Sequence, residues 1–360
     1  MCIIAGYSGN KQAAPILIEM LKKTEYIDGG LSTGIATIHE GKLYTRKILG
    51  DVEKLISETD ALSLPGTTGI IHSRTANNYL SHAHPQVSDD GKLAAVDNGT
   101  MIQTLCDEFA NESNGIMAEL INKGIKVKSE IDTPNGYQRL PNGHGYHETE
   151  LWALYIGDAV KNSPKERLAE DIAASTKDII ERLPADIITL NVHADLPNTI
   201  TIGNVTRPMS CGFGNGETYL ATVPLAFPEE IQKNPIIHLP PTSISRATPN
   251  GIEILSTSLK GTRVEQIDYR IAARIRTDME KILKGRKDNP VSIYDLPFRT
   301  EWNEVWSGEA VDSIYKNPNG LLKPYAAIMY ECLWSFHKEG VLHSALGEKN
   351  NKTYLKFWID

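Results

Sequence analysis

The sequence predicts a layered domain of the α/β or α+β class over residues 1–262 and a mainly helical region over residues 263–360. Short strand-like runs separated by amphipathic stretches fill the first part, and helical periodicity dominates the second. The composition is the third observation, because 360 residues with 41% hydrophobic and 23% charged content can bury a large core without disulfides or a structural metal. We therefore expect a folded chain that needs no cofactor for its stability.

The elements of the first part follow from two periodicities. Seven runs read as strands: Cys2–Gly6, Thr33–Ile38, Gly69–His72, Lys92–Val96, Ile187–Val192, Thr199–Ile202 and Thr218–Val223. Between them, apolar residues recur at threes and fours, which predicts helices at Ala13–Lys23, Glu112–Lys123, Thr149–Lys161 and Lys165–Glu181.

The C-terminal region has a different pattern. One long amphipathic helix is predicted by apolar residues at Val264, Ile267, Ile271, Ile275, Met279 and Ile282. A loop rich in Asn and Pro follows Gly285, and a second helix is predicted from about Leu321 to Lys338. A short strand, Thr353–Ile359, closes the chain.

Charge and cysteine usage exclude several function classes. With 37 basic and 45 acidic residues the net charge is −8, so no positive field attracts nucleic acid or an anionic membrane, and a small molecule or a protein is the expected partner. The four cysteines show no metal-ligand spacing and suit a reducing compartment. Neither a basic leader nor an apolar run long enough to span a bilayer is present, so we expect a cytoplasmic protein.

Cys2 is the residue with the clearest chemical potential. Removal of Met1 would make it the amino terminus, so one residue would carry both a thiol and a free α-amine. An α-amine has a pKa of about 7.7–8.0, is partly neutral near pH 7.5, and can take the proton of the thiol. The position predicts an N-terminal nucleophile, although a buried apolar cysteine in an edge strand fits it too.

Five segments in order resemble the class II glutamine amidotransferases, a branch of the N-terminal nucleophile hydrolases, and most of all the glutaminase domain of glucosamine-6-phosphate synthase. They are Met1-Cys2-Ile-Ile-Ala-Gly-Tyr7, Thr24–Ala36, Gly69-Ile-Ile-His-Ser-Arg-Thr-Ala76, Ala83-His-Pro85 and Val96-Asp-Asn-Gly99. Weaker likeness continues through Glu148-Thr-Glu150 and Gly214–Thr222. The resemblance covers about residues 1–260 and implies a four-layer αββα sandwich with the nucleophile at the end of a central strand.

The resemblance also implies roles for individual residues. Cys2 would attack the amide, and the Asn98 side-chain amide with the Gly99 backbone N–H would stabilise the oxyanion. Arg74 corresponds to the arginine that binds the α-carboxylate of glutamine, for which a planar bidentate cation is suited. Glu148 corresponds to the aspartate that binds the α-ammonium.

Three departures affect the predicted substrate pocket. Glu148 is one methylene longer than the aspartate of the family, Thr75 replaces a tryptophan, and Asn77-Asn78-Tyr79 replaces Thr-His-Gly. The stretch between Gly99 and Glu148 is also longer than the family pattern. Thr75 and Asn77, together with Arg74 and Glu148, are therefore predicted to bind the substrate. Because of these departures, the sequence does not decide which amide is the substrate.

Three function hypotheses follow. The first is a glutamine amidotransferase that hydrolyses glutamine through a Cys2 thioester and passes ammonia to an acceptor or to a synthase partner, because residues 263–360 are too few for two sugar-isomerase domains. The second is an N-terminal-cysteine amidase for another γ-glutamyl or amide compound. The third is a non-catalytic relative that binds a small ligand or a protein through the retained scaffold. A homo-oligomer is left open.

A metal site is the weakest interpretation. His82 and His84 alternate as on one strand face, and His144 lies three residues before His147, beside Glu148. A metal could be held there only with carboxylate help from Glu148, and we expect none.

Overall fold

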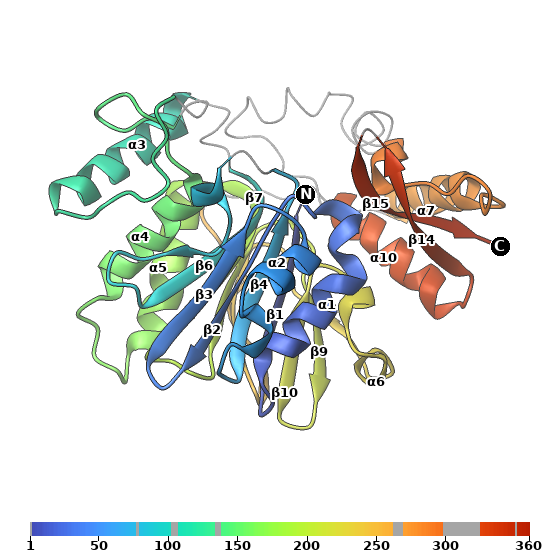
Figure 1. Ribbon diagram of the computed structural model, residues 1–360, viewed down its shortest axis with the longest axis horizontal. Coiled ribbons are helices and arrows are strands. Elements are labelled where there is room, and N and C mark those ends of the chain that lie inside the picture. The colour runs from blue at the N-terminus through green and yellow to red at the C-terminus, as the bar shows by residue number, and fades with distance from the viewer. Residues whose placement is uncertain are drawn as a thin grey trace.

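The computed structural model describes residues 2–76, 79–101, 107–133, 138–261, 269–297, 325–349 and 351–360. Two antiparallel sheets stack face to face, and helices cover their outer faces (Figure 1). This arrangement confirms the α+β class and the four-layer αββα sandwich.

The first sheet has seven strands in the order β11-β9-β10-β1-β4-β2-β3, with β1 in its centre. Their bounds are β1 Ile3–Ser8, β2 Ser32–His39, β3 Lys42–Ile48, β4 Thr68–Arg74, β9 Ser210–Gly214, β10 Glu217–Ala221 and β11 Ile237–His238. The second sheet has six strands in the order β13-β12-β8-β7-β6-β5. Their bounds are β5 Gln86–Val87, β6 Leu93–Met101, β7 Ala185–His193, β8 Ile200–Asn204, β12 Ser243–Thr248 and β13 Gly251–Ser256. Each of the seven predicted runs overlaps one of these strands.

The α-helices of the first 261 residues are α1 Ala13–Asp28, α2 Val52–Glu58, α3 Asp107–Asn122, α4 Glu148–Val160, α5 Leu168–Arg182 and α6 Glu229–Gln232. Short 3-10 turns occur at Ala61–Ser63, Leu80–His82 and Pro224–Ala226. The four predicted helices correspond to α1, α3, α4 and α5.

Three apolar cores separate the four layers. Along β1, Ile3, Ala5 and Tyr7 face the helical layer of α1, whereas Ile4 faces the second sheet. This alternation follows from the two-residue period of a strand, and it requires both faces of β1 to be apolar because both are covered. The third core lies between α4, α5 and the outer face of the second sheet.

A buried carboxyl joins several elements beneath the first helical layer. Glu25 of α1 accepts hydrogen bonds from Thr33 at 2.9 Å, from Ser73 at 2.7 Å and from the Val52 backbone at 3.0 Å. Burial raises the pKa of Glu25 to about 7, although the hydrogen bonds oppose that rise. The contacts connect α1 to β2, β4 and α2 at one point.

The C-terminal region contains more strand than its sequence pattern predicts. Its described elements are α7 Tyr269–Leu283, a 3-10 turn at Ile293–Asp295, α10 Tyr325–Lys338, β14 Leu342–Lys349 and β15 Lys352–Ile359. β14 and β15 form a separate antiparallel hairpin, of which only the second strand was predicted. Apolar side chains of α7, α10 and β15 belong to the same core as α1, so this region packs on the α1 side of the sandwich (Figure 1). The predicted boundary at 262 lies outside the described residues.

Candidate active site

Cys2 immediately precedes β1, at the end of the central strand of the first sheet. Its backbone N–H donates to Asn98 Oδ1 at 2.8 Å, and Asn98 Nδ2 donates to the Cys2 carbonyl oxygen at 2.6 Å. Asn98 belongs to β6 of the other sheet, so this pair of hydrogen bonds fixes Cys2 across the sandwich. The side chain of Cys2 is a free thiol, and the residue is only partly buried.

Asn98 contacts Cys2 directly, and Gly99 follows Asn98 in β6. A carboxamide carries two N–H donors, and the contact with Cys2 uses one of them. Gly99 has φ +145°, and a Cβ there would approach the carbonyl oxygen of Asp186 to 1.9 Å. Only glycine fits this position, because both the dihedral angle and the neighbouring β7 backbone exclude a side chain.

Arg74 ends β4 on the other side of Cys2. The antiparallel register pairs Ile3 with Ser73, which places Arg74 beside Cys2 at the same end of the sheet. One guanidinium nitrogen of Arg74 donates to the His82 carbonyl oxygen at 2.6 Å, which orients the side chain.

Glu148 begins α4, and its side chain is largely buried. Burial raises the pKa of Glu148, while the positive charge of Arg74 acts in the opposite direction. The structure thus brings Arg74 and Glu148 close enough to interact electrostatically near Cys2. The two residues predicted to bind the carboxylate and the ammonium of an amino-acid ligand therefore lie near each other.

Four histidine rings form a layer beneath these residues. The ring centroids are 4.2 Å apart for His72 and His84, 5.0 Å for His82 and His147, and 5.2 Å for His84 and His147. Burial is the largest cause that lowers the pKa of all four rings, and the charge of Arg74 adds to it. The rings are therefore neutral near pH 7, and they pack as a polar wall behind the site.

The prediction that His82 and His84 lie on one strand face is wrong. His82 ends a 3-10 turn, and His84 precedes Pro85 in a cis peptide bond. His144 lies apart from the layer and pairs with Glu130 at 2.6 Å. Among the residues that the structure describes, no three His, Cys, Asp or Glu side chains are arranged to hold a metal ion.

His72 and Asp97 also lie at the site, and no role was predicted for either, although both fall in the motifs that carry the resemblance. Asp97 is buried beside Asn98, and burial raises the pKa of Asp97 to about 7. Its backbone N–H donates to His84 Nδ1 at 3.3 Å. His72 and Asp97 could have been noticed because each lies in a strand that is covered on both faces. Buried titratable groups in such strands are often found at functional sites.

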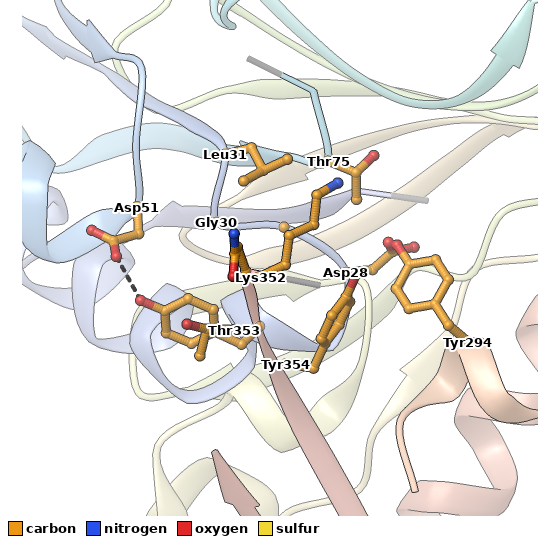
Figure 2. Close-up of a pocket in the computed structure, with 12 residues that line it drawn as sticks. Asp28, Gly30, Leu31, Asp51, Thr75, Tyr294, Lys352, Thr353 and Tyr354 are labelled. Carbon is orange, nitrogen blue, oxygen red and sulfur yellow. Dashed lines mark hydrogen bonds between the residues drawn. The ribbon is translucent and has the colours of Figure 1, made fainter. Parts of the chain in front are cut away.

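Thr75 lines a separate polar cavity of about 330 Å³. Its walls come from the end of α1, the start of β2 and the tip of the C-terminal hairpin, and Figure 2 shows the Lys352 side chain reaching toward Thr75. The Leu31 backbone N–H donates to the Arg74 carbonyl oxygen at 3.0 Å, so this cavity borders the Arg74 side of the site. Asn77 and Asn78 lie outside the described residues.

No protein-family model matches the chain. It is 29% identical over 225 residues to a glutamine–fructose-6-phosphate aminotransferase (isomerizing) of Pyrococcus horikoshii, which covers 62% of this chain and 32% of that protein. A protein of the same name from Tropheryma whipplei is 30% identical over 240 residues, covering 65% and 34%. The chain thus spans about a third of the length of these relatives.

These relatives support the identification of the chain as a class II glutamine amidotransferase. A solved structure, the glutamine phosphoribosylpyrophosphate amidotransferase of B. subtilis, matches with a TM-score of 0.54 at 19% identity, over 73% of this chain and 50% of that one. At that identity the likeness concerns the fold, which is the sandwich described above. Within the part of the chain that the structure describes, no helix is long and apolar enough to cross a membrane.

Proposed function

We propose that this protein is an enzyme that hydrolyses the side-chain amide of glutamine to glutamate and ammonia, with Cys2 as nucleophile once Met1 is removed. The observation that carries the proposal is the pair of hydrogen bonds between Cys2 and Asn98 at 2.8 and 2.6 Å, with Arg74 at the neighbouring strand end. The similarity to these relatives, and their names, support the same reaction class.

The reaction begins with a proton transfer within Cys2. The neutral α-amine takes the thiol proton, and the thiolate attacks the amide carbon of glutamine. Asn98 and the Gly99 N–H donate to the oxygen that becomes negative, and Arg74 and Glu148 hold the two charged ends of the amino acid. When the carbon–nitrogen bond breaks, the nitrogen takes the proton from the amine and leaves as ammonia.

A water molecule completes the cycle. It attacks the thioester carbonyl, the α-amine receives its proton, and glutamate leaves with the thiol restored. The neutral histidine layer adds no charge that would compete with Arg74 for the ligand carboxylate. Ammonia would pass to an acceptor bound to this chain or to a synthase partner.

A second candidate substrate class, another γ-glutamyl or amide compound, is favoured by the cavity at Thr75. Where the family has a bulky tryptophan, this chain has a threonine that borders a 330 Å³ space containing Lys352. That space could receive a leaving group larger than ammonia. Cys2, Cys211 and Cys332 are free thiols, which suits the reducing, cytoplasmic setting that we propose.

The test measures glutamate and ammonia released by the purified full chain, whose intact mass first establishes that Met1 is absent. The matched variants are Cys2→Ser, which removes the thiol, and Cys211→Ser, which alters a buried cysteine away from the site. We expect release by the parent and by Cys211→Ser, and none by Cys2→Ser. Activity that survives in Cys2→Ser would refute the proposal. Faster turnover of γ-glutamyl anilides than of glutamine would favour the second substrate class.

A further inference from the structure

The segment from His82 to His84 contacts the elements that carry the predicted glutamine site. The His82 carbonyl oxygen accepts from Arg74, the predicted carboxylate partner, at 2.6 Å. Two residues later, the His84 ring contacts β6, which carries Asn98, and α4, which begins with Glu148. His84 is 3% exposed, so these contacts lie inside the sandwich. One short segment therefore connects strand ends and a helix that are far apart in the sequence.

The two ring nitrogens of His84 have different partners. Nδ1 accepts from the Asp97 backbone N–H at 3.3 Å, and Nε2 lies 3.0 Å from the Thr149 hydroxyl oxygen. A backbone N–H can only donate, so Nδ1 carries no proton and the single proton of the neutral ring is on Nε2. The Nε2–H group therefore donates to Thr149. Asp97 precedes Asn98 and Thr149 follows Glu148, so the ring joins the neighbours of two predicted site residues.

The surroundings of His84 keep its ring neutral and fixed. Burial is the largest cause that lowers the pKa of His84 well below its ordinary value, and positive charge on neighbouring side chains acts in the same direction. The ring centroid of His72 lies 4.2 Å away, and that of His147 lies 5.2 Å away with its plane at 86°. Lys47 Nζ donates to the carbonyl oxygen of Ala83 at 2.9 Å, which holds the backbone that precedes the ring. The imidazole is thus a fixed bridge with one acceptor and one donor.

We propose that His84 is a positioning residue that joins the oxyanion strand β6 to the start of α4 and so fixes the spacing between Asn98 and Glu148. The inference rests on the proposed function, because it concerns how two parts of the glutamine site are held relative to each other. The Nδ1 contact serves the oxyanion side, and the Nε2 contact serves the ammonium side. Loss of the first should therefore lower kcat, and loss of the second should raise KM.

Two substitutions separate the two contacts of the ring. In His84→Asn the amide oxygen takes the place of Nδ1, and the donor to Thr149 is lost. In His84→Gln the amide nitrogen takes the place of Nε2, and the acceptor of the Asp97 N–H is lost. We expect His84→Asn to raise the KM for glutamine about 2- to 12-fold with kcat close to that of the parent, the range for one neutral hydrogen bond. We expect His84→Gln to lower kcat by about the same factor with KM close to that of the parent.

Thr149→Val tests the contact with α4 without altering the histidine rings. It replaces the hydroxyl by a methyl group and should raise KM as His84→Asn does, whereas Thr149→Ser keeps the hydroxyl and should retain the parent KM. His193→Asn is the matched control and should change neither constant. His193 is buried at the end of β7 remote from Gly99, and its Nδ1 also accepts a backbone N–H, that of Asp195, at 3.1 Å.

A readout that does not depend on turnover is long-range proton–nitrogen NMR of the labelled imidazoles, with the His84 signals identified by their loss in His84→Asn. The proposal predicts the neutral Nε2–H tautomer for His84 near pH 7. It is overturned by an Nδ1–H tautomer, by parent kinetic constants in both His84 variants, or by a parent KM in Thr149→Val. A parent chain that hydrolyses no glutamine would refute the proposed function, whereas the tautomer of His84 would still test the bridge.

Discussion

Asn98→Ala is the substitution whose consequence the structure defines most closely. It deletes the acceptor of the Cys2 N–H and the donor to the Cys2 carbonyl, which are hydrogen bonds of 2.8 and 2.6 Å. Each such bond stabilises a fold by about 0.5–1.5 kcal/mol, so the variant should lose roughly 1–3 kcal/mol of unfolding free energy. Because the deleted amide is also the proposed oxyanion donor, kcat should fall by about 100- to 1,000-fold.

The assay is steady-state glutamine hydrolysis, with thermal unfolding measured in parallel. The KM for glutamine should change far less than kcat, because the variant keeps Arg74 and Glu148, the proposed partners of the two ends of the substrate. Asn191→Ala is the matched control, since Asn191 is buried on β7 and its side chain contacts Thr176 instead of Cys2. A variant Asn98→Ala that retains the parent kcat, while Cys2→Ser is inactive, would refute the assignment of Asn98 to the oxyanion site.

Three further outcomes are expected. Gly99→Ala should leave little protein folded, so its thermal melt should show a small unfolding transition or none, because its Cβ would lie 1.9 Å from the Asp186 carbonyl oxygen. A melting temperature equal to that of the parent would contradict this reasoning. Arg74→Lys should raise the KM for glutamine at least about 10-fold, since a lysine cannot hold a carboxylate with two parallel bonds, and an unchanged KM would remove Arg74 from the carboxylate site. Burial raises the pKa of Glu25 from 4.5 to about 7, so the folded state binds this proton more tightly than the unfolded state does, and the resulting stabilisation is lost as pH rises from about 4.5 to 7. Denaturant unfolding across this pH range should show the loss of unfolding free energy in the parent and not in Glu25→Gln. Identical pH profiles for the two proteins would contradict the assignment.

The sandwich could be predicted from the sequence because its strands have short apolar runs with turn residues between them. Ile3, Ile4 and Ala5 are apolar in succession because helices cover one face of β1 and a second sheet covers the other. The edge strands β3 and β13 were harder to predict from the sequence. Their residues are largely exposed or half-buried, so polar side chains interrupt the apolar pattern by which a strand is recognised. The first strand of the C-terminal hairpin, with exposed Leu346, was missed for the same reason.

The site could be predicted only in part. Cys2, Arg74, Asn98 and Gly99 were identified because each falls in a motif whose chemistry is specific, and the structure places them at one end of the sandwich. Their roles remain predictions.

The central claim is that Cys2 is a mature nucleophile in a glutamine-shaped pocket, and covalent labelling tests it most directly. The intact mass of the purified chain is measured before and after incubation with a glutamine-mimicking diazoketone, alongside Cys2→Ala. The account predicts a starting mass without Met1 and a single adduct that Cys2→Ala does not form. A chain that lacks Met1 and gains no adduct, or gains the same adduct in Cys2→Ala, would contradict it.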